Sequence, residues 1–174
     1  MIEVVVAGLS RPPGATGVLL LLKELEGPRM LPVGIGAYEA EAIALHFQGF
    51  PVPRPLTHDL LAQVLVSLKG ELRRVELSAL EQGTFYARLM VDQAGHQLAI
   101  DSRPSDAVAL AVRVAVPIYV AETVLDEAGV IPEQPEEPEE GAGGVDVSKL
   151  SVFKEFIDTL EEKEEDQGDP ESSS

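Results

Sequence analysis

The sequence predicts an α+β fold in which two β-β-β-α units form a curved, mixed or antiparallel sheet with helices packed on it. Three observations support this prediction. A polar stretch that runs into an apolar helix occurs twice, each copy follows three strand-like stretches, and strands and helices do not alternate as they do in parallel α/β sheets. Apolar residues make up 45% of the chain, which is enough to fill a core.

The repeat is clearest between 35-IGAYEAEAIALHF-47 and 100-IDSRPSDAVALAV-112, which align at an offset of 65 residues. In this alignment Glu41 matches Asp106, and each is followed by alanine, a β-branched residue, alanine and leucine. We therefore expect a helix to begin in each segment, with an acidic residue at an equivalent position.

Six apolar stretches read as strands, three before each copy of the repeat: 2–9, 17–25, 30–35, 72–80, 83–91 and 96–100. Gly27 stands between the second and third strand of the first unit, and Gly95 stands at the same place in the second unit. Glycine favours the tight turns of β-hairpins, so we expect a hairpin turn at each of these positions.

A further helix is expected between the two copies, at 57-THDLLAQVLVSLKG-70. Thr57 is the expected N-cap, because its hydroxyl can accept a hydrogen bond from a free backbone N–H of the first turn. Asp59 lies in that first turn, and Gly70 marks the expected C-terminal stop.

Pro104 sets the start of the helix in the second copy. Proline suits the first helical turn and restricts the preceding Arg103 to an extended conformation. Asp106 is then the third residue of the helix, near the positive end of its dipole. After this helix, 116–122 reads as a strand and 123–129 as a short helix.

Composition divides the chain into a folded domain at 1–131, a linker at 132–148, an amphipathic helix at 149–165 and a tail at 166–174. The linker is rich in proline, glutamate and glycine, and we expect it and the tail to be disordered. The predicted acidic helix places four apolar residues on one helical stripe, Leu150, Phe153, Ile157 and Leu160, with Phe156 beside it. Such a helix is expected to dock on its own domain or on a partner protein.

The net charge of −17 is unevenly distributed. Residues 1–131 hold 15 acidic and 10 basic residues, a net of −5, whereas residues 132–174 hold 15 and 3, a net of −12. Neither part has the basic surface typical of proteins that grip nucleic acid, so nucleic-acid chemistry would need divalent cations or a local basic patch.

The chain has no cysteine, which excludes disulfides and a thiolate nucleophile. Since no signal peptide and no apolar run of about 18 residues occurs, we expect a soluble cytoplasmic protein without membrane association.

Polar residues at the helix starts form a set suited to phosphodiester cleavage. Carboxylates are preferred ligands of Mg²⁺ and Mn²⁺, histidine acts as a general acid or base, and arginine clamps phosphate. The predicted catalytic residues are Glu41, His58, Asp59, Asp101, Arg103 and Asp106. The predicted phosphate-binding residues are Arg54, Arg103 and Ser105, and the predicted metal ligands are Glu41, Asp101 and Asp106.

The same residues also have structural explanations. Asp106 and Glu41 suit the positive end of a helix, which is worth about 0.3–1 kcal/mol without any further role. Asp101 and Arg103 lie two residues apart, on one side of an extended segment, where they form either part of a site or a structural ion pair. No Walker loop, GxGxxG or HExxH motif occurs, so spacing alone leaves the function open.

Five segments together resemble the bifunctional nuclease domain of bacteria and plants: 34-GIGAYEAEAIAL-45, 54-RPLTHDLL-61, 83-GTFYARL-89, 101-DSRPSDAVALAVR-113 and 117-PIYVAE-122. The resemblance extends from about residue 2 to residue 129. It implies a compact α+β domain that forms a homodimer and acts as a nuclease on DNA and RNA. The family's signature positions fall on Glu41, Arg54, Thr57, His58, Asp59, Asp101, Arg103, Pro104, Ser105 and Asp106.

The predicted function is therefore a nuclease that hydrolyses phosphodiester bonds in DNA and RNA with the help of Mg²⁺ or Mn²⁺. The alternative is a non-catalytic regulatory or protein-interaction module whose tail helix at 149–165 docks a partner. The acidic surface favours this alternative, because it does not attract nucleic acid. A third interpretation is a sensor that binds an anion or a nucleotide at the helix N-termini.

Overall fold

The computed structural model describes residues 1–12, 16–49 and 52–132 of the chain, all of which belong to a compact unit, Met1–Glu133. The linker predicted beyond residue 132, the helix predicted at 149–165 and the tail at 166–174 lie outside the described residues. No helix within the described part is long and apolar enough to cross a membrane.

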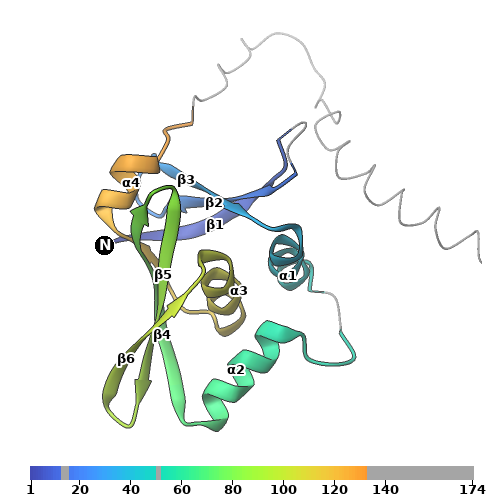
Figure 1. The fold of residues 1–174 in the computed structure, drawn as a ribbon. Coiled ribbons are helices and arrows are strands. Elements are labelled where there is room, and N and C mark those ends of the chain that lie inside the picture. Colours follow the sequence, from blue (N-terminus) through green and yellow to red (C-terminus); the bar gives the residue numbers. More distant parts are fainter. Residues whose placement is uncertain (13–15, 50–51, 133–174) are drawn as a thin grey trace, which may run out of the picture. The chain divides into compact units, whose positions relative to one another are not determined.

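The structure confirms the predicted α+β fold: a curled, mixed sheet of seven strands with four helices packed against it (Figure 1). The elements follow one another as β1 Ile2–Ser10, β2 Val18–Glu24, β3 Met30–Ile35, α1 Ala37–Gln48, α2 Thr57–Ser67, β4 Gly70–Glu81, β5 Thr84–Gln93, β6 His96–Ser102, α3 Pro104–Val114, β7 Ile118–Val120 and α4 Glu122–Ala128. The two predicted β-β-β-α units are β1–β3 with α1 and β4–β6 with α3.

The order of the strands in the sheet is β3-β2-β1-β7-β4-β5-β6. Each unit forms an antiparallel meander, and the three-residue strand β7 joins the two meanders, antiparallel to β1 and parallel to β4. β7 therefore makes one continuous sheet from the two repeats. It also leaves β3 and β6 as the outermost strands.

Helix α3 is the central helix of the core. Six of its residues are buried, including the three alanines Ala107, Ala109 and Ala111. Small side chains allow neighbouring elements to approach closely, and α3 packs on β4 and β5 as well as on α1 and α2 (Figure 1). From α1, Ala40 and Ile43 are buried in the same core.

The boundaries of α2 differ from the prediction. Leu56, with φ −76° and ψ 174°, is the N-cap, and Thr57 is the first helical residue. The carboxylate of Asp59 caps this end, because its Oδ2 accepts a hydrogen bond of 2.9 Å from the backbone N–H of Leu56. At the other end, Lys69 adopts the left-handed conformation with φ 60°, so Gly70 is the first residue of β4 and does not stop the helix.

Two hairpins have two-residue turns in which both residues are left-handed. Ala94 and Gly95, with φ 53° and 79°, connect β5 to β6 and confirm the turn predicted at Gly95. Gln82 and Gly83, with φ 50° and 77°, connect β4 to β5, where the sequence predicted that Gly83 begins the strand. Turns of this kind match the twist of the strands they join, which explains the glycine at each second position.

Candidate functional site

The N-terminus of α3 is built as the sequence predicts. Arg103, with φ −69° and ψ 147°, is the extended N-cap, and Pro104 is the first helical residue. Asp106 is consequently the third residue, where its carboxylate meets the positive end of the helix dipole. Because β6 ends at Ser102, the strand delivers the chain directly to this helix start.

Arg103 joins two carboxylates at this point. Its Nε and Nη2 donate hydrogen bonds of 2.7 Å and 3.1 Å to the two carboxylate oxygens of Asp106. Its Nη1 donates a third bond, of 2.8 Å, to Oε1 of Glu39 in α1. A guanidinium has five N–H groups, so two of them make no hydrogen bond with any residue that the structure describes. The side chain is 65% exposed, so a ligand in solvent can reach the guanidinium.

His58 is the second partner of Asp106. Its Nε2 lies 3.1 Å from Oδ1 of Asp106, and the histidine is buried, with 8% of its surface exposed. Burial raises the pKa of Asp106, but hydrogen bonds from Arg103 and His58 outweigh it and hold this pKa below its usual value. Asp106 is thus ionised at neutral pH and can only accept hydrogen bonds. The hydrogen in this bond is therefore on Nε2 of His58, which donates it to Asp106.

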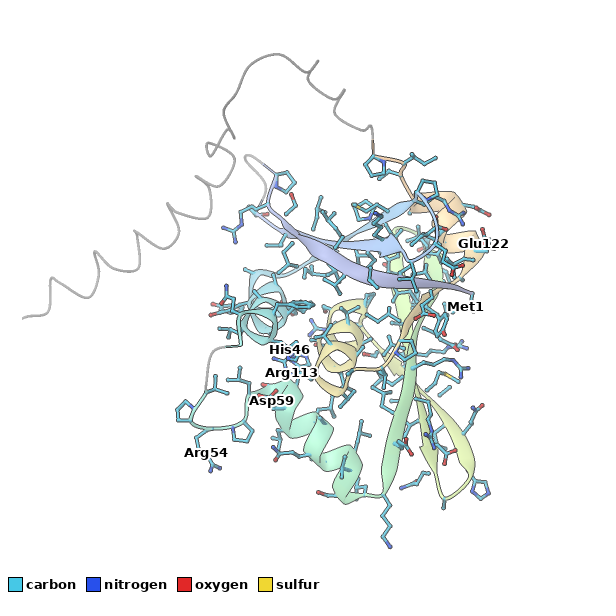
Figure 2. All side chains as sticks on the ribbon, turned by 180° about the vertical axis from the view of Figure 1, so that it is seen from behind. Met1, His46, Arg54, Asp59, Arg113 and Glu122 are labelled. Carbon is cyan, nitrogen blue, oxygen red and sulfur yellow. The ribbon has the colours of Figure 1, made fainter. Side chains whose placement is uncertain are left out.

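Asp59, in contrast, belongs to a structural link between helices. Nε of Arg113 donates a hydrogen bond of 2.7 Å to Oδ1 of Asp59, and Nη2 donates one of 2.8 Å to the carbonyl oxygen of Ala42. Burial raises the pKa of Asp59, and the hydrogen bonds from Leu56 and Arg113 lower it below its usual value. Figure 2 shows Arg113 and Asp59 facing each other where α1, α2 and α3 meet. Arg113 was not predicted as a functional residue; its position in the last turn of a largely buried helix was the available signal.

An open hollow of about 300 Å³ adjoins the exposed side of Arg103. Residues from three places line it, the β3–α1 junction, the β4–β5 turn and the start of α3: Val33, Gly34, Ile35, Gly36, Glu39, Gly83, Thr84, Phe85, Arg103, Pro104 and Ser105. Ser105 is 6% exposed, and its hydroxyl makes no side-chain hydrogen bond with any residue that the structure describes. The hollow therefore combines a carboxylate, a guanidinium with free donors and an unused hydroxyl.

The structure brings together only part of the predicted set. Asp106, Arg103 and His58 form one hydrogen-bonded group, and Ser105 lies beside it. Arg54 is exposed and lies at the outer end of its loop, away from Asp59 and Arg113 (Figure 2).

Asp101 does not join the group, and the predicted ion pair between Asp101 and Arg103 is wrong. Asp101 pairs with Arg88 in the ladder between β6 and β5. Arg88 alternates with the buried residues Ala87 and Leu89, so Asp101 and Arg88 face away from the core. Arg103 has left the strand, and its ion-pair partners among the described residues are Glu39 and Asp106.

Glu39 takes the place that the repeat assigned to Glu41. The first helical residue of α1 is Ala37, so Glu39 is the third residue of its helix, as Asp106 is in α3. Glu41 lies half a turn further along α1 and is exposed. The sequence alignment was therefore two residues out of register at the helix start.

The predicted metal ligands do not form a metal site in the described part of the chain. Residues 1–12, 16–49 and 52–132 contain no group of three or more histidine, aspartate or glutamate side chains arranged to hold an ion. Both carboxylate oxygens of Asp106 are already bound by Arg103 and His58, and Asp101 faces away from the core. The residues present therefore do not fit a metal held by Glu41, Asp101 and Asp106.

Comparison with known proteins identifies the family of this chain. The family model of the bifunctional nuclease domain matches residues 20–133. Two curated relatives from Mycobacterium tuberculosis strains, "Uncharacterized protein MT1877" and "Uncharacterized protein Rv1829", are each 47% identical to this chain over 133 residues. The match covers 76% of this chain and 79% of each relative. The chain therefore belongs to the bifunctional nuclease domain family.

Proposed function

We propose that the protein is a nuclease that hydrolyses phosphodiester bonds in DNA and RNA at the hollow beside Arg103. Family membership supports the reaction class. The observation that carries the choice of site is the geometry of Arg103: it is held by two carboxylates, it is 65% exposed, and two of its N–H groups make no hydrogen bond with a described residue.

Phosphate binding is the first role of the site. The two free N–H groups of Arg103 can donate to two oxygens of one phosphate, as arginine commonly does. The hydroxyl of Ser105 lies on the same side and supplies a third donor. Arg103 does not cap α3 through its side chain, so the first backbone N–H groups of the helix also favour an anion here.

Glu39 is the proposed general base, because its carboxylate lines the hollow. In this proposal a water molecule attacks phosphorus while Glu39 accepts its proton. The bond from the water oxygen to phosphorus forms, and the bond from phosphorus to the leaving sugar oxygen breaks. The sugar oxygen keeps the electron pair of that bond and takes up a proton from solvent. Asp106 and His58 are positioning residues, since they fix the guanidinium of Arg103 and do not line the hollow.

Glu39→Gln and Glu41→Gln form a matched pair that tests this assignment. Both changes remove one negative charge from the same helix, but only Glu39 contacts Arg103 and the hollow. Loss of a general base lowers the rate about 10²–10⁴-fold. We therefore expect kcat/KM on labelled single- and double-stranded DNA and RNA to fall by at least about 10²-fold in Glu39→Gln. Glu41→Gln should cleave like the wild type.

Arg103→Lys tests phosphate binding in the same assay, with Arg88→Lys as its control. Lysine cannot hold two carboxylates and a phosphate with planar N–H pairs, so we expect a loss of about 10²-fold or more in kcat/KM. Arg88 lies on the outer face of the sheet and should tolerate the change. Each assay is run with Mg²⁺, with Mn²⁺ and with EDTA, because the sequence predicts a divalent ion. Equal cleavage by all four variants would assign the activity to a different site or to a contaminant.

A non-catalytic interaction module is the second candidate. The net charge of −5 over residues 1–131 favours it, because such a surface repels nucleic acid. If the purified wild-type chain cleaves none of these substrates under any of the three metal conditions, the nuclease proposal fails and this candidate takes its place.

A further inference from the structure

Strand β6 is an open edge of the sheet. Within the described part of the chain it pairs with β5 alone, over seven residues without a bulge. Its sequence, 96-HQLAIDS-102, contains no proline and no lysine, the residues that commonly protect edge strands from pairing. All residues from His96 to Asp101 are exposed. This edge therefore offers free backbone donors and acceptors to another strand.

The edge also carries apolar side chains on one face. Leu98 and Ile100 are 41% and 40% exposed, and they stand opposite Val91 and Leu89 of β5, which are buried. Residues that face each other in an antiparallel ladder share a face of the sheet. Leu98 and Ile100 therefore extend the apolar layer of the core to the outermost strand, where nothing described in the chain covers them.

Helix α2 adjoins this layer and is itself poorly covered. A side chain placed at Gly70 would touch both Val91 and Leu65, so Leu65 of α2 packs beside the strand that pairs with β6. Four large apolar residues of α2, Leu60, Leu61, Val64 and Val66, are 37–71% exposed. Uncovered apolar surface next to an open strand edge is typical of a protein–protein contact.

The turn between β5 and β6 determines which residues of β6 can pair with another strand. In a two-residue hairpin the flanking residues, here Gln93 and His96, form a hydrogen-bonded pair. Backbone groups alternate along a strand, so His96, Leu98 and Ile100 direct theirs toward β5. Gln97, Ala99 and Asp101 direct theirs outward.

We propose that a second copy of this chain pairs with β6, antiparallel and centred on Ala99. In this register Ala99 faces Ala99 of the second copy, and Gln97 faces Asp101 of the second copy. All three outward-directed residues of each strand are then hydrogen-bonded. Leu98 meets Ile100 of the second copy on the apolar face, twice by symmetry.

The register is self-complementary in charge as well as in shape. Asp101 faces an uncharged glutamine, so no two carboxylates stand opposite each other. A shift by one residue of the two-fold axis, to Leu98 or to Ile100, leaves an outward-directed residue of each strand unpaired. It also places Ile100 against His96 or Leu98 against Ser102. The β6 sequence therefore favours its own copy in one register.

Cysteine substitutions in the full-length chain test this register, because the protein contains no cysteine of its own. The Cα atoms of a hydrogen-bonded antiparallel pair lie about 5.5 Å apart, which a disulfide can span. Ala99→Cys should form a covalent dimer on mild oxidation. Gln97→Cys should not, because its two copies lie roughly 13 Å apart along the strand, whereas the double variant Gln97→Cys with Asp101→Cys should. Cross-linking through Gln97→Cys alone would overturn the register.

Molar mass in solution tests the interface without cross-linking. We expect the wild-type chain to be a dimer by light scattering at micromolar concentration, and Leu98→Lys with Ile100→Lys to be a monomer with unchanged circular dichroism. Tyr86→Lys is the matched control, since Tyr86 is also 41% exposed but lies on the opposite face of β5, and it should remain dimeric. A monomeric wild type would overturn the proposal and leave residues 149–165 of the same chain as the occupant to test. A dimer that survives the double lysine change would overturn it too.

Discussion

Arg113 in α3 and Asp59 in α2 form an ion pair of 2.7 Å that ties together the helices around the core. The arginine side chain is 6% exposed, and the same guanidinium also donates to the carbonyl oxygen of Ala42 in α1. One buried side chain therefore fixes the positions of α1 and α2 relative to α3. Glu39 and His58, which meet at Arg103 and Asp106, are carried by these same two outer helices.

Replacing Arg113 with methionine should destabilise the fold. The change leaves the carboxylate of Asp59 and the carbonyl of Ala42 without their donor, and breaking a buried ion pair typically costs about 3–5 kcal/mol. Because Asp59 is 30% exposed, we expect the lower end of that range, measured by urea unfolding. Arg73→Met removes an exposed pair with Glu71 and should change the free energy of unfolding by less than about 1 kcal/mol. Equal losses of unfolding free energy in the two variants would show that the Arg113–Asp59 pair stabilises the fold no more than an exposed ion pair.

Stability should fall as the solution becomes acidic, through Asp59 and Asp106. Both carboxyl groups have pKa values below their usual value in the folded state. At a pH near the ordinary value of about 3.9 the unfolded chain therefore binds more protons than the folded one. Their contribution is fully present above about pH 5 and is lost as the pH falls through the lowered folded pKa values.

Urea midpoints between about pH 3 and pH 7 measure this dependence. Asp59→Asn and Asp106→Asn should each flatten the acid limb, since the substituted group no longer binds a proton. Asp101→Asn is the control, because Asp101 makes no ion pair with a described residue. An acid limb that is equally steep in all three variants would contradict the assignment.

Local chemistry explains what the sequence predicted well. Pro104 restricts the backbone at its own position and at Arg103, so the start of α3 follows from two residues alone. The alternating apolar pattern of the strands likewise depends only on neighbours along the chain, and each predicted strand is present.

The errors arise where position depends on distant parts of the chain. In the frame of the repeat α1 begins two residues earlier than α3, because Gly36 serves as N-cap and no proline sets the start. The apolar pattern aligns the buried residues of the two helices. It does not show that α1 starts two residues earlier, and Glu41 was therefore predicted in place of Glu39. The place of β7 between the two units is a matter of tertiary pairing. This pairing places β1 and β4 on the two sides of β7, and no local pattern in the sequence predicts it.

His58 should affect cleavage through Asp106 and Arg103, and not by contact with substrate. His58→Gln retains a side-chain N–H donor, whereas His58→Leu removes it and leaves Asp106 with Arg103 as its side-chain donor. We expect Leu to lower kcat/KM and to raise the pKa of Asp106 toward its usual value, and Gln to restore most of the activity. The Asp106 carboxyl resonance, followed by NMR against pH, measures that pKa directly. If His58→Leu is inactive but its Asp106 pKa is as low as in the wild type, His58 acts on the substrate itself.

Gly36→Ala should disconnect Glu39 from Arg103 while leaving the fold intact. Gly36 is the N-cap of α1 in an ordinary extended conformation, with φ −73° and ψ 161°, so alanine is not strained there. Its Cβ would overlap the carboxylate of Glu39, which lies at the end of a flexible side chain and moves away readily. Gly17→Ala is the neighbouring control, since its Cβ would make one ordinary contact of 3.6 Å with the carbonyl oxygen of Ile35. If Glu39 is the general base, Gly36→Ala should lose at least about tenfold in kcat with little change in KM, because the base is displaced and the phosphate donors stay in place. A Gly36→Ala protein that cleaves as fast as Gly17→Ala would remove Glu39 from the reaction.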